Sequence, residues 1–196
     1  MGKEFELKFA ASGEQQDAIR QTIGGSFTSI SMETTYYDTP SGALSALRYT
    51  LRRRLENGVS ICTVKTPIDE TGRGEWEWAC QDIAESIPVL CKLGAPGSLA
   101  VLAQEGLVPI CGARFTRLAQ TVELDGAEAE LALDSGVLIG GGRELPFREV
   151  EVELKSGSEA AVILYARQLS ESFGLKIEGR SKFRRALELA KGENNG

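Results

Sequence analysis

The feature that most constrains the fold of this chain is the alternation of charged and apolar residues along short runs. At 3–10, for example, Glu4, Glu6 and Lys8 alternate with large apolar residues. Successive side chains of a β-strand point to opposite faces, so these three charges share one face. Glycine-rich turns separate the runs, which is typical of an antiparallel meander. The alternation predicts strands at 3–10, 33–38, 50–56, 59–66, 74–80, 114–124, 127–134 and 146–155.

Four helices are expected beside these strands. Ser12 with Gln15, and Ser156 with Glu159, have the spacing of a capping box, which marks the start of a helix. Many strands with few helices predict an α+β fold. No linker divides the chain, so one domain is expected over 1–191, followed by a disordered polar tail at 192–196. The predicted helices cover 12–23, 98–106, 156–173 and 181–191.

Composition excludes several classes of chemistry. The chain has no histidine, which excludes Ser-His-Asp and Cys-His catalysis and histidine-containing zinc sites. Its 22 Lys and Arg against 28 Asp and Glu give a net charge of −6. An acidic protein lacks the overall field for sequence-independent nucleic-acid binding, so no nucleic-acid partner is expected.

The cysteines and the apolar runs bear on the cellular compartment. The four cysteines contain no C-x-x-C pair, which argues against a zinc or redox motif and favours reduced thiols. No run approaches the roughly 18 apolar residues of a membrane span, and no signal peptide opens the chain. We therefore expect a cytoplasmic protein with no membrane partner; the sequence leaves a homodimer open.

Acidic side chains gather on particular strand faces. Glu149, Glu151 and Glu153 share one face, and Glu75 and Glu77 share another. One interpretation is an amphipathic sheet with its charged face in water. However, carboxylates about 4 Å apart repel by roughly 4 kcal/mol, and like charges opposite each other destabilise a sheet. A hard divalent cation among them, Mg²⁺ or Mn²⁺, would offset this repulsion.

Basic side chains gather on other strands, where they would face an anion. Arg52 and Arg54 share one face, and arginine matches phosphate oxygens with two parallel hydrogen bonds. Metal-holding carboxylates together with several cations are what a polyphosphate substrate requires. The candidate cations are Arg52, Arg54, Lys65, Arg117, Lys182 and Arg185.

The motifs resemble those of the CYTH, or triphosphate tunnel metalloenzyme, superfamily along the full length of the chain. Glu4-Phe5-Glu6-Leu7-Lys8 is similar to its E-x-E-x-K opening. Other matching segments are Tyr36-Tyr37-Asp38-Thr39-Pro40, Leu51-Arg52-Arg53-Arg54, Thr63-Val64-Lys65, Arg73-Gly74-Glu75 to Glu77, Arg114-Phe115-x-Arg117, Asp134-Ser135-Gly136, Glu149-x-Glu151-x-Glu153-Leu154, and Ser181-Lys182-x-x-Arg185, where Ala186 stands in place of a common glycine.

The resemblance implies a closed antiparallel eight-stranded β-barrel with a charged interior and helices packed outside. It implies metal-dependent hydrolysis of a triphosphate inside that tunnel, with Mg²⁺ or Mn²⁺ as cofactor. The implied catalytic residues are Glu4, Glu6, Lys8, Arg54 and Lys65. The implied phosphate-binding residues are Lys8, Arg52, Arg54, Lys65, Arg117, Lys182 and Arg185. The implied metal ligands are Glu4, Glu6, Glu151 and Glu153, with Asp134, Glu75, Glu77 and Glu149 in a second tier.

Several alternatives stay open at this point. A nucleoside or thiamine substrate needs an apolar or aromatic pocket, and none is evident, which favours inorganic tripolyphosphate. The alternatives are an adenylate cyclase, a thiamine triphosphatase and a polyphosphate-binding module without turnover.

The roles of several single residues also stay open. Helix phase does not decide whether Arg184 or Arg185 faces the site, and Asp38 fits a structural role equally well. Trp76 and Trp78 are expected in the core outside the barrel.

Overall fold

A single antiparallel sheet organises the molecule. The structure is a computed structural model that describes residues 5–67 and 73–192. Within them, nine strands follow the order β5-β4-β3-β2-β6-β7-β8-β1-β9. The strands are β1 (Glu6–Ala10), β2 (Thr28–Asp38), β3 (Thr50–Glu56), β4 (Val59–Pro67), β5 (Arg73–Ala79), β6 (Val108–Leu124), β7 (Ala127–Gly140), β8 (Arg143–Gly157) and β9 (Lys176–Ile177).

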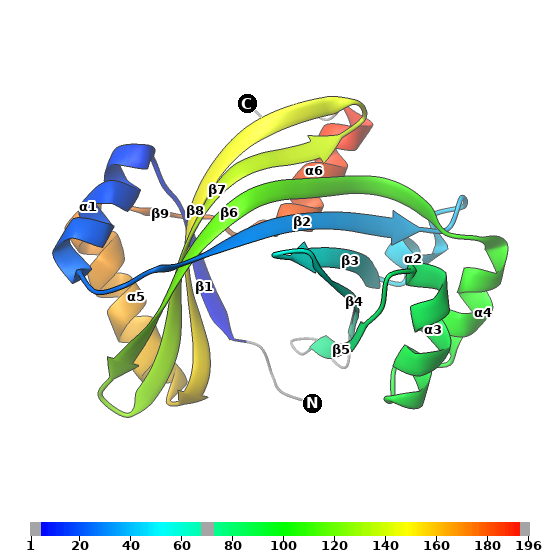
Figure 1. Cartoon of the computed structure of the whole chain (residues 1–196), viewed down its shortest axis with the longest axis horizontal. Coiled ribbons are helices and arrows are strands. Elements are labelled where there is room, and N and C mark those ends of the chain that lie inside the picture. The colour runs from blue at the N-terminus through cyan, green and yellow to red at the C-terminus, as the bar shows by residue number, and fades with distance from the viewer. Residues whose placement is uncertain (1–4, 68–72, 193–196) are drawn as a thin grey trace.

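The sheet is open, so the expected closed eight-stranded barrel is wrong. A closed barrel needs hydrogen bonding to continue around the whole circumference. Here β5 and β9 lie at the two ends of the strand order, and in the described part of the chain they do not pair with each other. The short β9 pairs with β1 instead, through Phe9–Ile177 and Ala10–Lys176. The long central strands nevertheless arch strongly over the middle of the molecule (Figure 1).

Helices lie at both ends of the arch (Figure 1). The predicted capping box at Ser12 and Gln15 is confirmed. The one at Ser156 is wrong, because β8 continues to Gly157 and the helix begins after Ser158. The helices are α1 (Gly13–Ile23), α2 (Ala43–Ala46), α3 (Ile83–Lys92), α4 (Ser98–Leu102), the 3₁₀ turn η1 (Ala103–Glu105), α5 (Glu159–Phe173) and α6 (Lys182–Lys191).

The outer face of the sheet is apolar and packs against most of the helices. Val150 and Val152 on β8 are fully buried in a cluster with residues of α1 and α5. Leu51 on β3 and Val64 on β4 are buried in a second cluster with α3 and α4. The partly buried Trp76 joins this second cluster as expected. Trp78 does not, since 47% of its surface is exposed.

The inner face carries the charged residues that alternate with those apolar ones, as the sequence pattern predicts. Helix α6 covers one end of this face, where Phe183 and Ala186 pack against a third apolar cluster. The hairpin between β7 and β8 approaches α6 closely. A Cβ at Gly140 would lie 2.4 Å from the Ala186 carbonyl oxygen and 2.7 Å from the Ala190 nitrogen. Glycine is therefore required there for α6 to lie against the sheet.

The remaining expectations concern local features. Cys62 and Cys111 are buried and unpaired, in agreement with reduced thiols. Among 5–67 and 73–192, no helix has the length and apolar character needed to cross a bilayer. Apart from Gly192, the expected tail at 192–196 lies outside the described residues, as does Glu4.

Candidate functional site

A cavity of about 280 Å³ opens on the inner face of the sheet. Strands β1, β2, β3, β4, β6 and β8 contribute to its wall, and the first turn of α6 completes it. Among the described residues, three glutamates line it, namely Glu6, Glu151 and Glu153. Six basic side chains of the same described part also line it, so this wall is strongly cationic although the whole chain is acidic. They are Lys8, Arg52, Arg54, Lys65, Arg117 and Lys182.

One wall is formed by Arg52 and Arg54 of β3 and by Lys65 of β4. Arg52 and Lys65 share the carboxylate of Glu75, at N–O distances of 3.5 and 3.3 Å. Arg54 pairs with Glu56 at 2.5 Å. The Nε atoms of Arg52 and Arg54 are buried and have no hydrogen-bond partner among the described residues. Burial and the adjacent Arg52 lower the pKa of Arg54, as expected where cations outnumber anions.

The opposite wall is formed by β1 and β8. Their register places Glu6 directly across from Glu153, and Lys8 across from Glu151. Lys8 lies 3.8 Å from Glu6, and Lys155 lies 3.0 Å from Glu153. The side chains of Glu6 and Glu153 remain 36% and 27% exposed, so their oxygens are accessible from the cavity. These two glutamates form the accessible acidic edge of the site.

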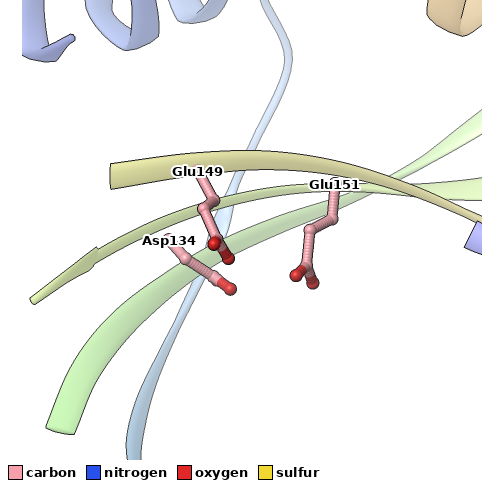
Figure 2. A group of neighbouring side chains, drawn as sticks. All are labelled: Asp134, Glu149 and Glu151. Carbon is pink, nitrogen blue, oxygen red and sulfur yellow. The ribbon is translucent and has the colours of Figure 1, made fainter. Parts of the chain in front are cut away.

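A deeper acidic group lies beside this wall. The carboxylates of Asp134, Glu149 and Glu151 lie within 4.8 Å of one another and point to the same side of the sheet (Figure 2). The Lys182 ammonium lies among them, 2.8 Å from Asp134, 2.5 Å from Glu149 and 2.7 Å from Glu151. A cation of the protein itself therefore occupies the space between the three carboxylates.

Two arginines complete this buried network. Arg117 donates two 2.8 Å hydrogen bonds to Asp134 and also contacts Glu151. Arg185 contacts Glu149. Its neighbour Arg184 is 70% exposed and pairs with Glu188, so of these two arginines Arg185 is the one that joins the network. Arg185 does not line the cavity, although the sequence predicted it as a phosphate-binding residue. At its edge, Arg117 also pairs with Glu130 and Arg185 with Glu178, at 3.6 and 3.7 Å.

Burial and pairing shift the pKa values in this network. Burial opposes ionisation of Glu151, but Lys182 and Arg117 outweigh it and lower the pKa to about 2. Burial raises the pKa of Glu149, against the opposing effect of Lys182 and Arg185. The pKa of Lys182 is raised, because its three carboxylate neighbours outweigh its burial. Glu151 and Lys182 are accordingly both charged at neutral pH.

The structure separates some of the carboxylates that the sequence grouped together as metal ligands. Glu75 lies on β5 and pairs with the basic wall, away from the acidic edge in the strand order. Glu77 lies on the same strand and is exposed. Asp38 has a structural role, since its carboxylate accepts hydrogen bonds from the backbone of Thr39, Leu44 and Ser45.

Sequence reasoning missed the uncharged part of the cavity wall. Tyr36, Phe115 and Phe183 all line it, although no apolar or aromatic pocket was evident from the sequence. The rings of Tyr36 and Phe183 pack against each other, with centroids 4.9 Å apart. Tyr36 pairs directly with Arg52 of the neighbouring strand β3, so the two side chains lie on the same face of the sheet. That pairing is the signal that would have identified Tyr36 as a cavity residue.

Comparison with known proteins identifies the family. The sequence model of the CYTH domain matches residues 2–187. The chain belongs to the CYTH domain family. An inorganic triphosphatase of Haemophilus influenzae is 28% identical over 196 residues, which cover 96% of this chain and 55% of that protein. The CYTH chain thus spans about half the length of that relative.

Two solved structures have the same fold. The PH1819 protein from Pyrococcus horikoshii is 26% identical with a TM-score of 0.62, over 95% of this chain and 99% of that one. HpAC1 from Hippeastrum, for which a dominant triphosphatase activity is described, has a TM-score of 0.71 at 17% identity, over 99% and 98% of the two chains. At this identity, HpAC1 supports the fold of this CYTH chain and not its activity.

Proposed function

We propose that this CYTH domain, residues 1–191, hydrolyses inorganic tripolyphosphate to pyrophosphate and phosphate with a divalent metal ion. The observation that carries the proposal is the charge of the cavity wall, to which the described part of the chain contributes six basic side chains and three glutamates. A metal-bound triphosphate carries several negative charges along a short chain, and it matches such a wall. The relative from Haemophilus influenzae, an inorganic triphosphatase, supports the same substrate.

The basic side chains would bind the phosphates. The buried Nε atoms of Arg52 and Arg54 lack partners among the described residues, and a phosphate oxygen would satisfy them. Arg54 and Lys65 reach the cavity from β3 and β4, while Lys8, Arg117 and Lys182 reach it from the other side. Catalysis of phosphoryl transfer rests mainly on positioning and charge stabilisation, so a site without histidine suffices.

Carboxylates at the acidic edge fit a divalent ion. Glu6 and Glu153 face each other across β1 and β8, and Glu151 lines the same cavity. These are the hard oxygen donors that Mg²⁺ and Mn²⁺ prefer. Glu4, two residues before Glu6, lies outside the described residues and is a further candidate. When bound there, the ion would stabilise negative charge on the phosphoryl oxygens.

The aromatic part of the wall favours a second candidate, a nucleoside triphosphate substrate. Tyr36 and Phe183 line the cavity and could contact an organic group. Their rings pack on each other, however, and the cavity is at the small end of the range for ligand pockets. These observations keep tripolyphosphate as the favoured substrate.

The test is phosphate release from tripolyphosphate, ATP and thiamine triphosphate, each with Mg²⁺, with Mn²⁺ and with EDTA. The proposal expects metal-dependent release that is fastest from tripolyphosphate and abolished by EDTA. Cyclic AMP from ATP without phosphate release would assign a cyclase instead. Tripolyphosphate binding without any product would assign a binding module.

A further inference from the structure

Asp134 and Glu149 are more deeply buried than the other acidic residues of the site. Both side chains are completely buried, with 0% of their surface exposed. Neither contributes to the cavity wall, whereas Glu6, Glu151 and Glu153 do. A metal ion that bridges to a substrate in the cavity would therefore reach Glu6 and Glu153 more readily than these two residues.

Protein cations already surround both carboxylates. Asp134 accepts two hydrogen bonds from Arg117 and lies 2.8 Å from Lys182. Glu149 lies 2.5 Å from Lys182 and contacts Arg185. The same cations also pair with acidic residues outside this group, since Arg117 lies 3.6 Å from Glu130 and Arg185 lies 3.7 Å from Glu178. The Lys182 ammonium already occupies the space between Asp134, Glu149 and Glu151, so a divalent ion there would have to displace a buried, paired cation, which is costly away from water.

A side chain on the face of the sheet opposite to the cations also fixes the backbone of Asp134 and Glu149. The Nε2 atom of Gln16 on α1 donates to the carbonyl oxygens of both Asp134 and Glu149, at 2.9 Å each. These two residues are direct partners across β7 and β8. Gln16 is itself buried, with 5% of its surface exposed. The pair is thus fixed by an amide on one face and by cations on the other.

We infer that Asp134 and Glu149 are positioning residues and not metal ligands. They hold Arg117 and Lys182 in the cavity wall and fix the first turn of α6 through Lys182 and Arg185. Part of this inference rests on the proposed function, because it assigns the metal to Glu6 and Glu153. The anchoring of α6 by the buried ion pairs does not depend on any substrate.

The first test measures Mn²⁺ binding to the full chain without substrate, from the electron paramagnetic resonance signal of free Mn²⁺. Asp134→Asn and Glu149→Gln are compared with Glu6→Gln and Glu153→Gln. The first pair is expected to keep an affinity close to wild type, and the second pair to lose about tenfold or more. Loss of Mn²⁺ affinity in folded Asp134→Asn equal to that in Glu6→Gln would overturn the inference.

A second measurement separates positioning from mere stabilisation. Tripolyphosphate binding is measured by calorimetry in EDTA, well below the melting temperature. Asp134→Asn should weaken binding by the folded protein, because Arg117 and Lys182 lose their orientation. If the folded variant binds tripolyphosphate as tightly as wild type does, Asp134 has no positioning role.

A third measurement does not require the proposed function. Glu149→Gln, Lys182→Met and the double variant form a thermal-stability cycle. Each single change removes one charge from the buried network and unbalances it, and should lower the melting temperature by about 10 °C, while the double variant should lose much less than the sum. If the losses of melting temperature are additive, the ion pair between Glu149 and Lys182 does not anchor α6. If wild type binds neither Mn²⁺ nor tripolyphosphate, the proposed function fails, and this cycle still decides the anchoring role.

Discussion

At the scale of single residues, the function of the site depends on which carboxylates remain accessible. Glu6 is partly exposed at the cavity wall, so its replacement removes little packing. We expect Glu6→Gln to lower turnover of tripolyphosphate by about 100-fold or more while the melting temperature stays near wild type. The matched control is Glu144→Gln, an exposed residue of β8 paired with Arg114, which should keep its activity. A Glu6→Gln protein that unfolds would assign Glu6 to the fold.

The buried Glu151 makes the stability of the protein depend on pH. Its pKa falls from the ordinary 4.5 to about 2 in the folded state. A carboxyl group with a lowered folded-state pKa stabilises the protein above its unfolded pKa and loses that contribution as pH falls. Glu151 should contribute about 3 kcal/mol at neutral pH, lost progressively between pH 4.5 and 2. Chemical denaturation of wild type and Glu151→Gln over this range measures the difference, which should shrink with falling pH; a constant difference would contradict the assignment.

The alternation pattern predicted which side chains share a face of the sheet, because strand periodicity is a local property. Lys8, Arg52, Arg54 and Lys65 all lie on the inner face, as their spacing predicts. The pattern did not predict that Lys182 lies between Asp134, Glu149 and Glu151. That contact joins α6 to two strands and depends on long-range packing, which no local spacing encodes.

At the scale of the elements, helix α6 determines one end of the cavity, and its approach depends on Gly140. A Cβ there would meet the backbone of Ala186 and Ala190. We expect Gly140→Ala to push α6 away and to cost about 1–3 kcal/mol of unfolding free energy, with weaker tripolyphosphate binding. Gly97→Ala is the control, because Gly97 has a helical backbone and a Cβ added there would meet no atom within 4 Å. Equal stability of the two variants in denaturant would show that α6 does not need this close approach.

Elements were predicted well where short-range signals are clear and poorly where packing decides. The capping box at Ser12 marks a real helix start, and the helix predicted to end at 173 does end at Phe173. Helix α3 was missed, since it contains Pro88, which lacks the amide hydrogen that a helix interior uses. The two-residue β9 was missed as well, because it exists only through its pairing with β1.

At the scale of the whole molecule, the sheet separates an apolar outer face from a charged inner face without closing into a barrel. The faces follow from alternation along each strand, and they were predicted. A closed barrel would require β5 to pair with the strand at the other edge of the sheet. At that edge β9 pairs with β1 instead. Strand patterns do not specify that long-range choice, and the barrel prediction failed at this point.

The central claim is that the inner face performs metal-dependent triphosphate hydrolysis, and neighbouring arginines of β3 allow a direct test. Arg54 lines the cavity, whereas Arg53 points to the other face and donates to the Gln81 carbonyl. The measurement is phosphate release from tripolyphosphate with Mg²⁺ by wild type, Arg54→Gln and Arg53→Gln, all confirmed as folded. We expect comparable rates for wild type and Arg53→Gln and a rate lower by about 100-fold for Arg54→Gln. No release by wild type, or equal loss in the two variants, would contradict the claim.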